Sequence, residues 1–253
     1  MQPKEDGMSE LKKDYQEENN LININSNISN EINYYTAYEK RYSQVYSKKM
    51  MWSSNQPTPD VINFFNEYNI PKNNMVLDLG CGEGRDAIYF LDKGYNIFAI
   101  DYSKTVIEMC NKITQNRYKN KFKTFDLIKD KMEEKFDFIY SVAVLHMFVT
   151  KEHRDKFLTF IKEHLNENGR CLLCVLGNGI ESYSSSIKDS FKNVNRTVMN
   201  NGTKLDIVAT SCRVVNWKEL ENEIIINNLT IEKKWISTEI PEFTNSMCVI
   251  VRR

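Results

Sequence analysis

The stretch from residue 75 to residue 101 constrains the fold of this chain more than any other part of it. Residues 75–79 form a short apolar run that is typical of a buried strand, and the glycine-rich segment 80–84 cannot extend that strand. Residues 85–93 carry apolar side chains at the spacing of a helix face, and residues 95–101 form a second apolar run that ends in an acid. This order predicts half of a doubly wound α/β sheet, whose ligand binds at the carboxyl ends of the strands.

The spacing of the glycines distinguishes between kinds of ligand. A dinucleotide fingerprint requires G-x-G-x-x-G, and Arg85 occupies the position of its third glycine. Asp78, Gly80, Gly82 and Gly84 instead give the pattern D-x-G-x-G-x-G. This pattern resembles the first motif of the class I S-adenosylmethionine-dependent methyltransferases. We therefore expect S-adenosylmethionine, and not a dinucleotide, as the cofactor.

A second resemblance lies in the segment Gly-Arg-Asp-Ala-Ile-Tyr-Phe-Leu at residues 84–91. It is similar to the tellurite-resistance and thiopurine-type small-molecule methyltransferases. The family resemblance implies an α/β, doubly wound, Rossmann-like sheet of seven strands in the order 3-2-1-4-5-7-6, with strand 7 antiparallel and helices on both faces. It also implies methyl transfer to a small-molecule acceptor. The alternatives are an RNA or protein methyltransferase and a non-catalytic protein that binds S-adenosylmethionine.

The rest of the chain supplies the alternating strands and helices that such a sheet needs. Helices are expected at 104–116, 153–165 and 217–227, and strands at 122–126, 136–144, 170–176, 229–236 and 246–251. Asn168-Gly169 is the expected end of the helix before the fifth strand. The methyltransferase domain is expected to span residues 34–253, after a polar, asparagine-rich segment 1–33 that is typical of a disordered tail.

Residues that would hold the cofactor follow the strand ends. Glycines lack a Cβ and permit close approach of the backbone, and an acid after the second strand can accept both ribose hydroxyls. By resemblance, Asp101 has this role and Asp126 accepts a hydrogen bond from the adenine amine. A helix cap is the alternative for Asp101, and a solvated turn is the alternative for Asp126. The expected cofactor-binding residues are Asp78, Gly80, Cys81, Gly82, Gly84, Arg85, Asp101, Tyr102, Asp126, Leu127, Ser141 and Val142.

Two residues of this region have open roles. Arg85 lies in the first turn of a helix, where the helix dipole disfavours a cation, so a compensating anion is expected. That anion is either the carboxylate of the methyl donor or the partner in a surface salt bridge. His146 follows the fourth strand and is our candidate general base, because its ordinary pKa suits neutral pH. Contact with the cofactor, or simple packing, is the alternative for His146.

The residues after the fourth strand also exclude several kinds of methyltransferase. The segment Ser-Val-Ala-Val-Leu-His at 141–146 lacks the paired prolines of amino-group DNA methyltransferases and the Pro-Cys nucleophile of cytosine-C5 enzymes. It also lacks the magnesium-binding acid of catechol-type enzymes. What remains resembles the Leu-His segment of small-molecule methyltransferases.

Two segments outside the minimal sheet are expected to enclose the acceptor. Residues 34–74 are predicted to form a helical lid, and packing of their tyrosines, spaced four apart, on the sheet is the alternative. Residues 177–216 are an insertion that would lie above the active site, where loops commonly carry specificity. The expected acceptor-binding residues are Tyr38, Tyr42, Tyr46, Trp52, Tyr183 and Arg196.

Composition narrows the partners and the compartment. The chain of 253 residues has 34 basic and 34 acidic side chains, so its net charge of zero gives no support for binding to nucleic acid or to an anionic membrane. The six cysteines lie mostly in apolar runs and indicate buried free thiols in the cytoplasm. Cys171 and Cys174 have a zinc-ligand spacing but lie in an expected strand without a second pair, so no metal site is expected. The sequence leaves the oligomeric state open.

Overall fold

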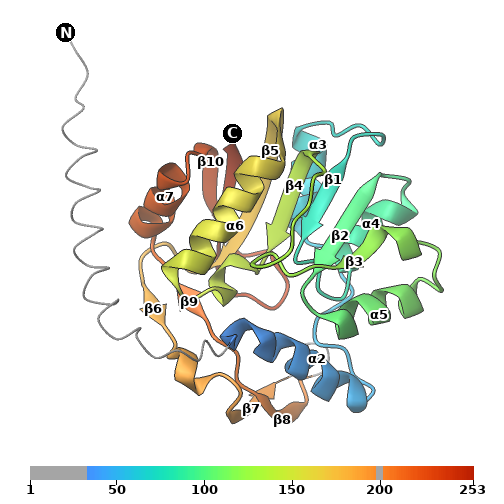
Figure 1. Ribbon diagram of the computed structural model, residues 1–253, viewed down its shortest axis with the longest axis vertical. Coiled ribbons are helices and arrows are strands. Elements are labelled where there is room, and N and C mark those ends of the chain that lie inside the picture. The colour runs from blue at the N-terminus through green and yellow to red at the C-terminus, as the bar shows by residue number, and fades with distance from the viewer. Residues whose placement is uncertain (1–32, 198–201) are drawn as a thin grey trace. The chain divides into compact units, whose positions relative to one another are not determined.

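A seven-stranded sheet forms the centre of the protein (Figure 1). The computed structural model describes residues 33–197 and 202–253, so the tail expected at 1–33 lies outside the described residues except for Asn33. The strands of the sheet are β1 (Val76–Leu79), β2 (Ile97–Asp101), β3 (Phe122–Thr124), β4 (Phe136–Val142), β5 (Leu165–Leu176), β10 (Thr230–Ser237) and β11 (Ser246–Arg252).

The strand order is β10-β11-β5-β4-β1-β2-β3. With β11 as the seventh strand and β10 as the sixth, it is the predicted order 3-2-1-4-5-7-6. Strand β11 is antiparallel to both of its neighbours, whereas β5, β4, β1, β2 and β3 are parallel to one another. The predicted fold class is therefore confirmed.

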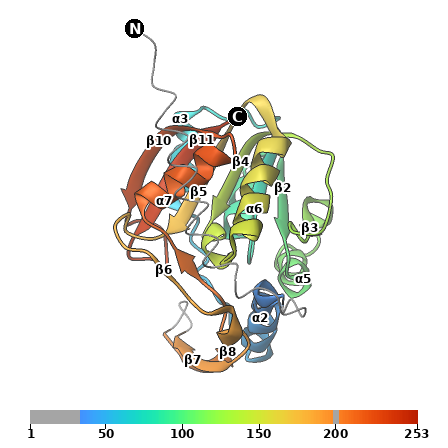
Figure 2. The same ribbon diagram turned by 60° about the vertical axis from the view of Figure 1, so that its left-hand side comes forward.

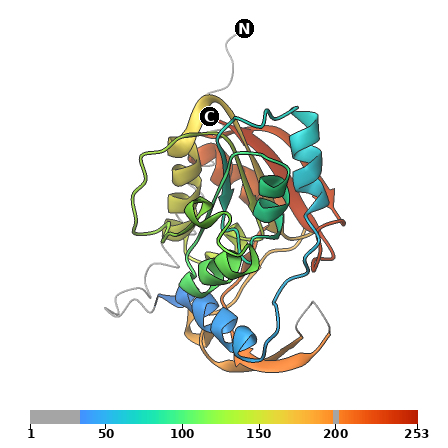
Figure 3. The ribbon, with the colours of Figure 1, turned by 90° about the vertical axis from the view of Figure 1, so that its right-hand side faces the viewer.

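Helices cover both faces of the sheet. On one face lie α3 (Pro59–Glu67), α4 (Arg85–Asp92) and α5 (Lys104–Ile113), and on the other lie α6 (Lys151–His164) and α7 (Trp217–Ile226) (Figures 2 and 3). Neighbouring strand residues point to opposite faces, so Leu172 packs with α3 and α4 while Leu173 packs with α6 and α7. All four residues of β1 are buried, as expected for a strand covered on both sides.

The connection between α6 and β5 differs from the prediction. The helix ends at His164 and the strand begins at Leu165, so the expected stop at Asn168-Gly169 is wrong. Leu165 already pairs with Phe136 of β4. The pairing of these two strands therefore begins before the irregularity in register between Phe136 and Phe138. Gly169 serves a different purpose, because a Cβ there would lie 2.8 Å from the backbone oxygen of Asp137.

Two segments outside this sheet lie beyond the carboxyl ends of its parallel strands. The first consists of the 3-10 helix η1 (Tyr34–Thr36) and helix α2 (Ala37–Ser47). The second contains β6 (Tyr183–Ser184), η4 (Ile187–Asp189), β7 (Asn193–Thr197), β8 (Lys204–Val208) and β9 (Arg213–Val214). Helix α2 and strand β8 lie side by side, and the backbone N–H of Val208 donates to Oε1 of Gln44 at 2.9 Å (Figures 1 and 3).

Two further 3-10 turns complete the described elements, η2 (Lys119–Lys121) before β3 and η3 (Leu145–Met147) after β4. Within residues 33–197 and 202–253, no helix is long and apolar enough to cross a membrane.

Candidate active site

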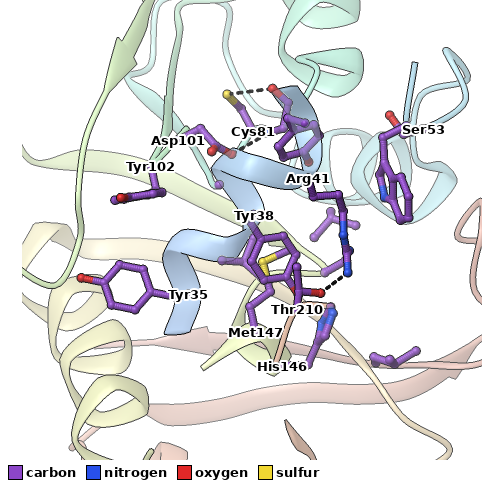
Figure 4. Close-up of a pocket in the computed structure, with 18 of the residues that line it drawn as sticks. Tyr35, Tyr38, Arg41, Ser53, Cys81, Asp101, Tyr102, His146, Met147 and Thr210 are labelled. Atoms are coloured by element: carbon purple, nitrogen blue, oxygen red, sulfur yellow. Dashed lines mark hydrogen bonds between the residues drawn. The ribbon is translucent and has the colours of Figure 1, made fainter. Parts of the chain in front are cut away.

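A cavity of about 740 Å³ opens at the carboxyl ends of β1, β2, β3 and β4 (Figure 4). Its size falls within the roughly 300–1,000 Å³ that small-molecule sites occupy. The glycine-rich loop and the strand ends line one side of it. Helix α2, the loop at 52–53 and the segment 183–212 line the other side, and the turn at 242–243 lies beside Arg85 of α4. The cavity therefore joins the sheet to the two segments that lie outside it.

The glycine loop brings its backbone close to the cavity. Gly80 has φ +81°, and a Cβ on it would lie 2.3 Å from Cγ2 of Val144. Gly82 has φ +50° and faces the Tyr42 hydroxyl, which would lie 3.4 Å from an added Cβ. Both positions have a left-handed backbone, and at Gly80 a side chain would also clash with Val144. Gly84, at the start of α4, is not part of the cavity lining.

Asp101 lies at the end of β2 and faces the cavity. Its carboxylate accepts the backbone N–H of Gly82 and the backbone N–H of Ser103, each at 2.9 Å. Because a carboxylate can accept about four hydrogen bonds, capacity remains for ligand hydroxyls. Ser103, and not Asp101, is the N-cap of α5. Burial raises the pKa of Asp101 to about 6.

The end of β3 provides a slot with aromatic walls. Tyr102, Asp126 and Leu127, which are predicted to bind the cofactor, all line the cavity. The hydroxyl of Tyr35 donates to Asp126 Oδ2 at 3.1 Å, and its ring meets the Tyr102 ring edge-on at 5.4 Å between centroids. The backbone N–H of Ile128 donates to Asp126 Oδ1 at 3.0 Å. Asp126 is therefore held by protein donors and still reaches the cavity.

Other predicted residues at β1 and β4 divide between the cavity and the core. Asp78 is 4% exposed and accepts a hydrogen bond from the Tyr140 hydroxyl at 3.1 Å. Burial, with the charge of Asp86 nearby, raises the pKa of Asp78 well above its ordinary value. Val142 lines the cavity, as does Cys81. Ser141 does not line the cavity, and its hydroxyl donates to the Leu79 carbonyl at 2.7 Å.

Arg85 has a protein anion beside it. Its Nη1 lies 2.7 Å from Oε2 of Glu242, which belongs to the turn between β10 and β11, and both side chains are nearly buried. The compensating anion in this structure is thus a carboxylate of the protein itself. Glu83 is also held by groups of the protein, since it accepts hydrogen bonds from the backbone N–H groups of Trp52 and Ser53 at 2.7 and 2.8 Å. These contacts fasten the loop at 52–53 to the glycine loop.

His146 lies in η3 and lines the cavity, but its environment does not suit a base. Its Nδ1 is buried without a hydrogen-bond partner among the described residues. Burial, together with the charges of Arg154 and Arg41, lowers the pKa of His146 to about 3. The imidazole is therefore neutral at pH 7 and accepts a proton only weakly. This environment favours contact with a ligand over general-base catalysis.

Arg154 holds the turn that carries His146. Its guanidinium is fully buried and donates to both carboxylate oxygens of Glu223, at 2.8 and 2.6 Å. Its Nη1 also donates to the carbonyls of Leu145 and Phe148, at 2.9 and 3.2 Å. A buried pair with this many hydrogen bonds fixes η3 against α6 and α7.

Most of the residues predicted to bind the acceptor surround the outer half of the cavity. The lining contains Tyr38, Tyr42, Trp52, Tyr183 and Arg196 but not Tyr46. The four-residue spacing of tyrosines continues along α2, yet the fully buried row of that helix is shifted by one residue to Ala37, Arg41 and Val45.

Sequence reasoning missed several contributors to the cavity, and three of them carry polar groups next to predicted positions. They are Tyr35, Arg41 and Glu83. The sequence signal for these residues was their position in the chain, because each is the immediate neighbour of a residue or motif that the sequence analysis had selected. The charge of Arg41 pointed away from burial, since arginine is rarely buried without a partner.

Within the described residues, no group of three or more His, Cys, Asp or Glu side chains is arranged to hold a metal ion.

The residues present fit S-adenosylmethionine. The glycine loop lines the cavity at Gly80 and Gly82 without side chains, Asp101 retains acceptor capacity for ribose hydroxyls, and the slot beside Asp126 has aromatic walls. The sheet order and the place of this site are those of the class I S-adenosylmethionine-dependent methyltransferase fold. The sequence model of the family described as Tellurite resistance protein TehB matches residues 41–209. The chain belongs to this TehB family.

Individual relatives agree with this assignment. A probable S-adenosyl-L-methionine-dependent methyltransferase TehB of Haemophilus influenzae is 32% identical over 99 residues, which are 39% of this chain and 34% of that protein. The chain thus matches about a third of the length of this curated relative.

Two solved structures share the fold. A 1,6-didemethyltoxoflavin-N1-methyltransferase of Burkholderia thailandensis has a TM-score of 0.66 at 15% identity, over 90% of this chain and 92% of that one. A TehB-like methyltransferase of Corynebacterium glutamicum has a TM-score of 0.52 at 15% identity, over 87% and 97%.

Proposed function

We propose that this protein transfers the methyl group of S-adenosylmethionine to a small-molecule acceptor held between α2 and the segment 177–216. One observation carries the proposal: a single cavity of about 740 Å³ is lined by the glycine loop and Asp101 on one side and by α2 and the insertion on the other. When bound, the cofactor supplies a methyl group activated by a sulfonium. The protein then has to bind, orient and enclose the two reactants.

The residues of the sheet divide the binding of the donor among them. Asp101 accepts the ribose hydroxyls, the slot formed by Tyr102, Asp126 and Leu127 takes the adenine, and the loop from Gly80 to Gly82 passes along the rest of the donor. Each of these groups lines the cavity. Asp101 and Asp126 are already oriented by protein N–H or O–H donors, which lowers the cost of ordering them on binding.

The outer segments exclude water from the place where the methyl group is transferred. Helix α2 is fastened to the insertion by the Tyr38 hydroxyl, which donates to the Ser211 carbonyl at 3.2 Å, and by the contact between Gln44 and Val208. Holding two reactants in line can supply much of the rate, so no enzyme nucleophile is required. A closed site of this kind takes a small acceptor more readily than a macromolecule.

A net charge of zero also argues against a nucleic-acid substrate. The solved 1,6-didemethyltoxoflavin-N1-methyltransferase named above holds 1,6-didemethyltoxoflavin and S-adenosylhomocysteine. All six cysteines are free thiols, which is consistent with a reducing compartment, and we place the protein in the cytoplasm.

Labelled methyl transfer tests the proposal. The protein is incubated with S-adenosylmethionine labelled on the methyl group and with a cell extract separated into metabolite and macromolecule fractions. We expect label in the metabolite fraction, and no label when Asp101→Ala replaces the wild type. Label confined to RNA or protein would contradict a small-molecule acceptor, and no transfer to any fraction would favour a binding protein without turnover.

A further inference from the structure

The cavity contains a buried cation that the binding of the donor, as proposed above, does not use. Arg41 projects from α2 and is 7% exposed. No carboxylate oxygen lies within 4.0 Å of its guanidinium among residues 33–197 and 202–253. Its Nε is buried without a hydrogen-bond partner in the same residues. Burying a charge without an opposite charge is costly, so a fold that retains one has a ligand to match it.

The guanidinium is held in one orientation. It lies over the ring of Trp52 at 4.7 Å and over the ring of Tyr38 at 5.0 Å, measured from Cζ to each centroid. Its Nη2 donates to Oγ1 of Thr210, which belongs to the segment 177–216. Aromatic contacts occupy the faces of a guanidinium and leave N–H groups at its edge. An edge of that kind recognises a carboxylate through two parallel hydrogen bonds.

The charges around the cavity are separated by side. The acids of the lining come from the glycine loop, the strand ends and the turn before β11, and each accepts hydrogen bonds from protein donors. The outer side instead holds Arg41 and, at its exposed edge, Arg196. Neither arginine has an ion-pair partner in the described part of the chain. Burial raises the pKa of Cys212, which lies on the same side, above its ordinary value. The positive charge of the nearby arginines acts in the opposite direction and lowers that pKa.

We propose that the methyl acceptor is a small organic carboxylate whose carboxyl group binds Arg41. This inference rests on the proposed function, because it names the acceptor of that same site. The guanidinium is directed away from Asp101 and Tyr102, where the nucleoside would lie, and toward Thr210 and His146 (Figure 4). Its hydrogen-bond partner therefore belongs to the insertion and not to the donor-binding strands.

The surroundings of Arg41 indicate an acceptor with a flat, apolar body. Met147 and Phe243 also line the cavity, and the Phe243 ring lies 6.1 Å from the His146 ring between centroids. Aromatic walls favour an unsaturated or aromatic carboxylate over a compact inorganic anion, which could not fill them. The neutral His146, with its unpaired Nδ1, offers one further polar contact in this chamber.

The test uses benzoate as the probe and benzamide as its neutral counterpart. Each is titrated into protein saturated with S-adenosylhomocysteine, using wild type, Arg41→Gln and Arg41→Lys. We expect wild type to prefer benzoate by at least about tenfold, the effect of a charge-assisted hydrogen bond, and Arg41→Gln to lose that preference. Arg41→Lys keeps the charge without the fork and should retain part of it. Arg117→Gln, which removes an exposed arginine paired with Asp92 away from the cavity, should bind benzoate like wild type.

A second pair of titrations separates the two possible sources of the carboxylate. S-adenosylhomocysteine carries an amino-acid carboxylate, and 5′-deoxy-5′-methylthioadenosine does not. We expect Arg41→Gln to bind both as tightly as wild type does. If the substitution weakens S-adenosylhomocysteine alone, Arg41 binds the donor and the proposal is wrong. Equal binding of benzoate and benzamide to wild type, or binding of neither, overturns it as well.

The benzoate titration is repeated without S-adenosylhomocysteine to keep the two claims apart. If wild type binds benzoate through Arg41 but does not bind S-adenosylhomocysteine, the anion site stands and the proposed methyl transfer fails. If S-adenosylhomocysteine binds and benzoate shows no dependence on Arg41, the carboxylate acceptor fails while methyl transfer stands. Thermal unfolding of each variant confirms that the compared proteins are folded.

Discussion

His146 and Arg41 share an unusual property at the scale of single residues. Both are more than nine-tenths buried, both line the cavity, and each retains a polar atom without a partner in the described residues. Buried polar groups in folded proteins are nearly always hydrogen-bonded, so exceptions that gather in one cavity indicate a ligand. These two exceptions lie on the acceptor side, where the residue pattern indicates function least clearly.

The lowered pKa of His146 predicts how stability depends on pH. Its pKa falls from an ordinary 6.5 to about 3 in the fold, so between these values the unfolded chain binds a proton that the native protein does not. Stability therefore rises with pH across this window and is lost as the pH falls below 6.5. From pH 7 to pH 5, wild type should lose up to about 2 kcal/mol more unfolding free energy than His146→Gln does.

Chemical denaturation of both proteins at the two pH values measures this difference. The raised pKa of Asp101 has the opposite effect, since its stabilisation is present at low pH and is lost as the pH rises through about 6, but it is common to both proteins and cancels. Equal pH dependence in the two proteins would show that His146 titrates normally, and would restore it as a candidate base.

The sequence could predict the residues of the glycine loop and Asp101 because their roles depend on neighbours in the chain. Gly80 and Gly82 need a backbone that only a residue without Cβ adopts easily, and Asp101 ends a strand. Arg41 was not predictable in this way. Its burial depends on Trp52 and Thr210, which approach it only after folding.

At the scale of elements, α2 lines the outer side of the cavity and has contacts on both of its own sides. Glu39 of α2 accepts hydrogen bonds from the hydroxyl and the backbone N–H of Thr105 in α5. On its other side, α2 contacts the insertion through Gln44 and Val208. If α2 acts as a lid, loosening its attachment to α5 should speed the release of ligand.

Thr105→Val tests the lid. It removes a hydroxyl donor to a carboxylate, a contact worth roughly 1.5–3 kcal/mol, so we expect S-adenosylhomocysteine to dissociate at least about threefold faster. Stopped-flow displacement measures the rate. Thr159→Val is the matched control, because it removes a hydroxyl that bonds Asn227 between α6 and α7, outside the cavity lining. An unchanged rate in Thr105→Val would make α2 a fixed wall and not a lid.

Elements with one clear periodicity were predictable, and junctions were not. The strands β10 and β11 and the helix α7 lie within one or two residues of their expected ranges. The start of β5 was placed too late because residues 165–169 are partly polar and contain a glycine. Their extended form is stabilised by pairing with β4, which is a contact between distant parts of the chain. The small sheet of β6 and β9 depends on such a contact as well, because Tyr183 pairs with Val214.

At the scale of the whole molecule, the fold brings a donor site and an acceptor chamber together at one edge of the sheet. The acids lie on the side of the strands, and the arginines without ion-pair partners in the described residues lie on the side of the insertion. Such a division suits a cationic donor that faces an anionic acceptor, because opposite charges then meet across the cavity. Strand order and motif spacing predict the donor site, whereas the acceptor chamber can be recognised only in the folded chain.

The central claim is that the glycine loop and Asp101 hold S-adenosylmethionine and not a dinucleotide. Calorimetric titration of the protein with S-adenosylhomocysteine and with NAD tests it most directly. We expect S-adenosylhomocysteine to bind, NAD not to bind, and Asp101→Ala to weaken S-adenosylhomocysteine by roughly 2–4 kcal/mol through the loss of hydrogen bonds to a charged group. Tight binding of NAD without binding of S-adenosylhomocysteine would contradict the account.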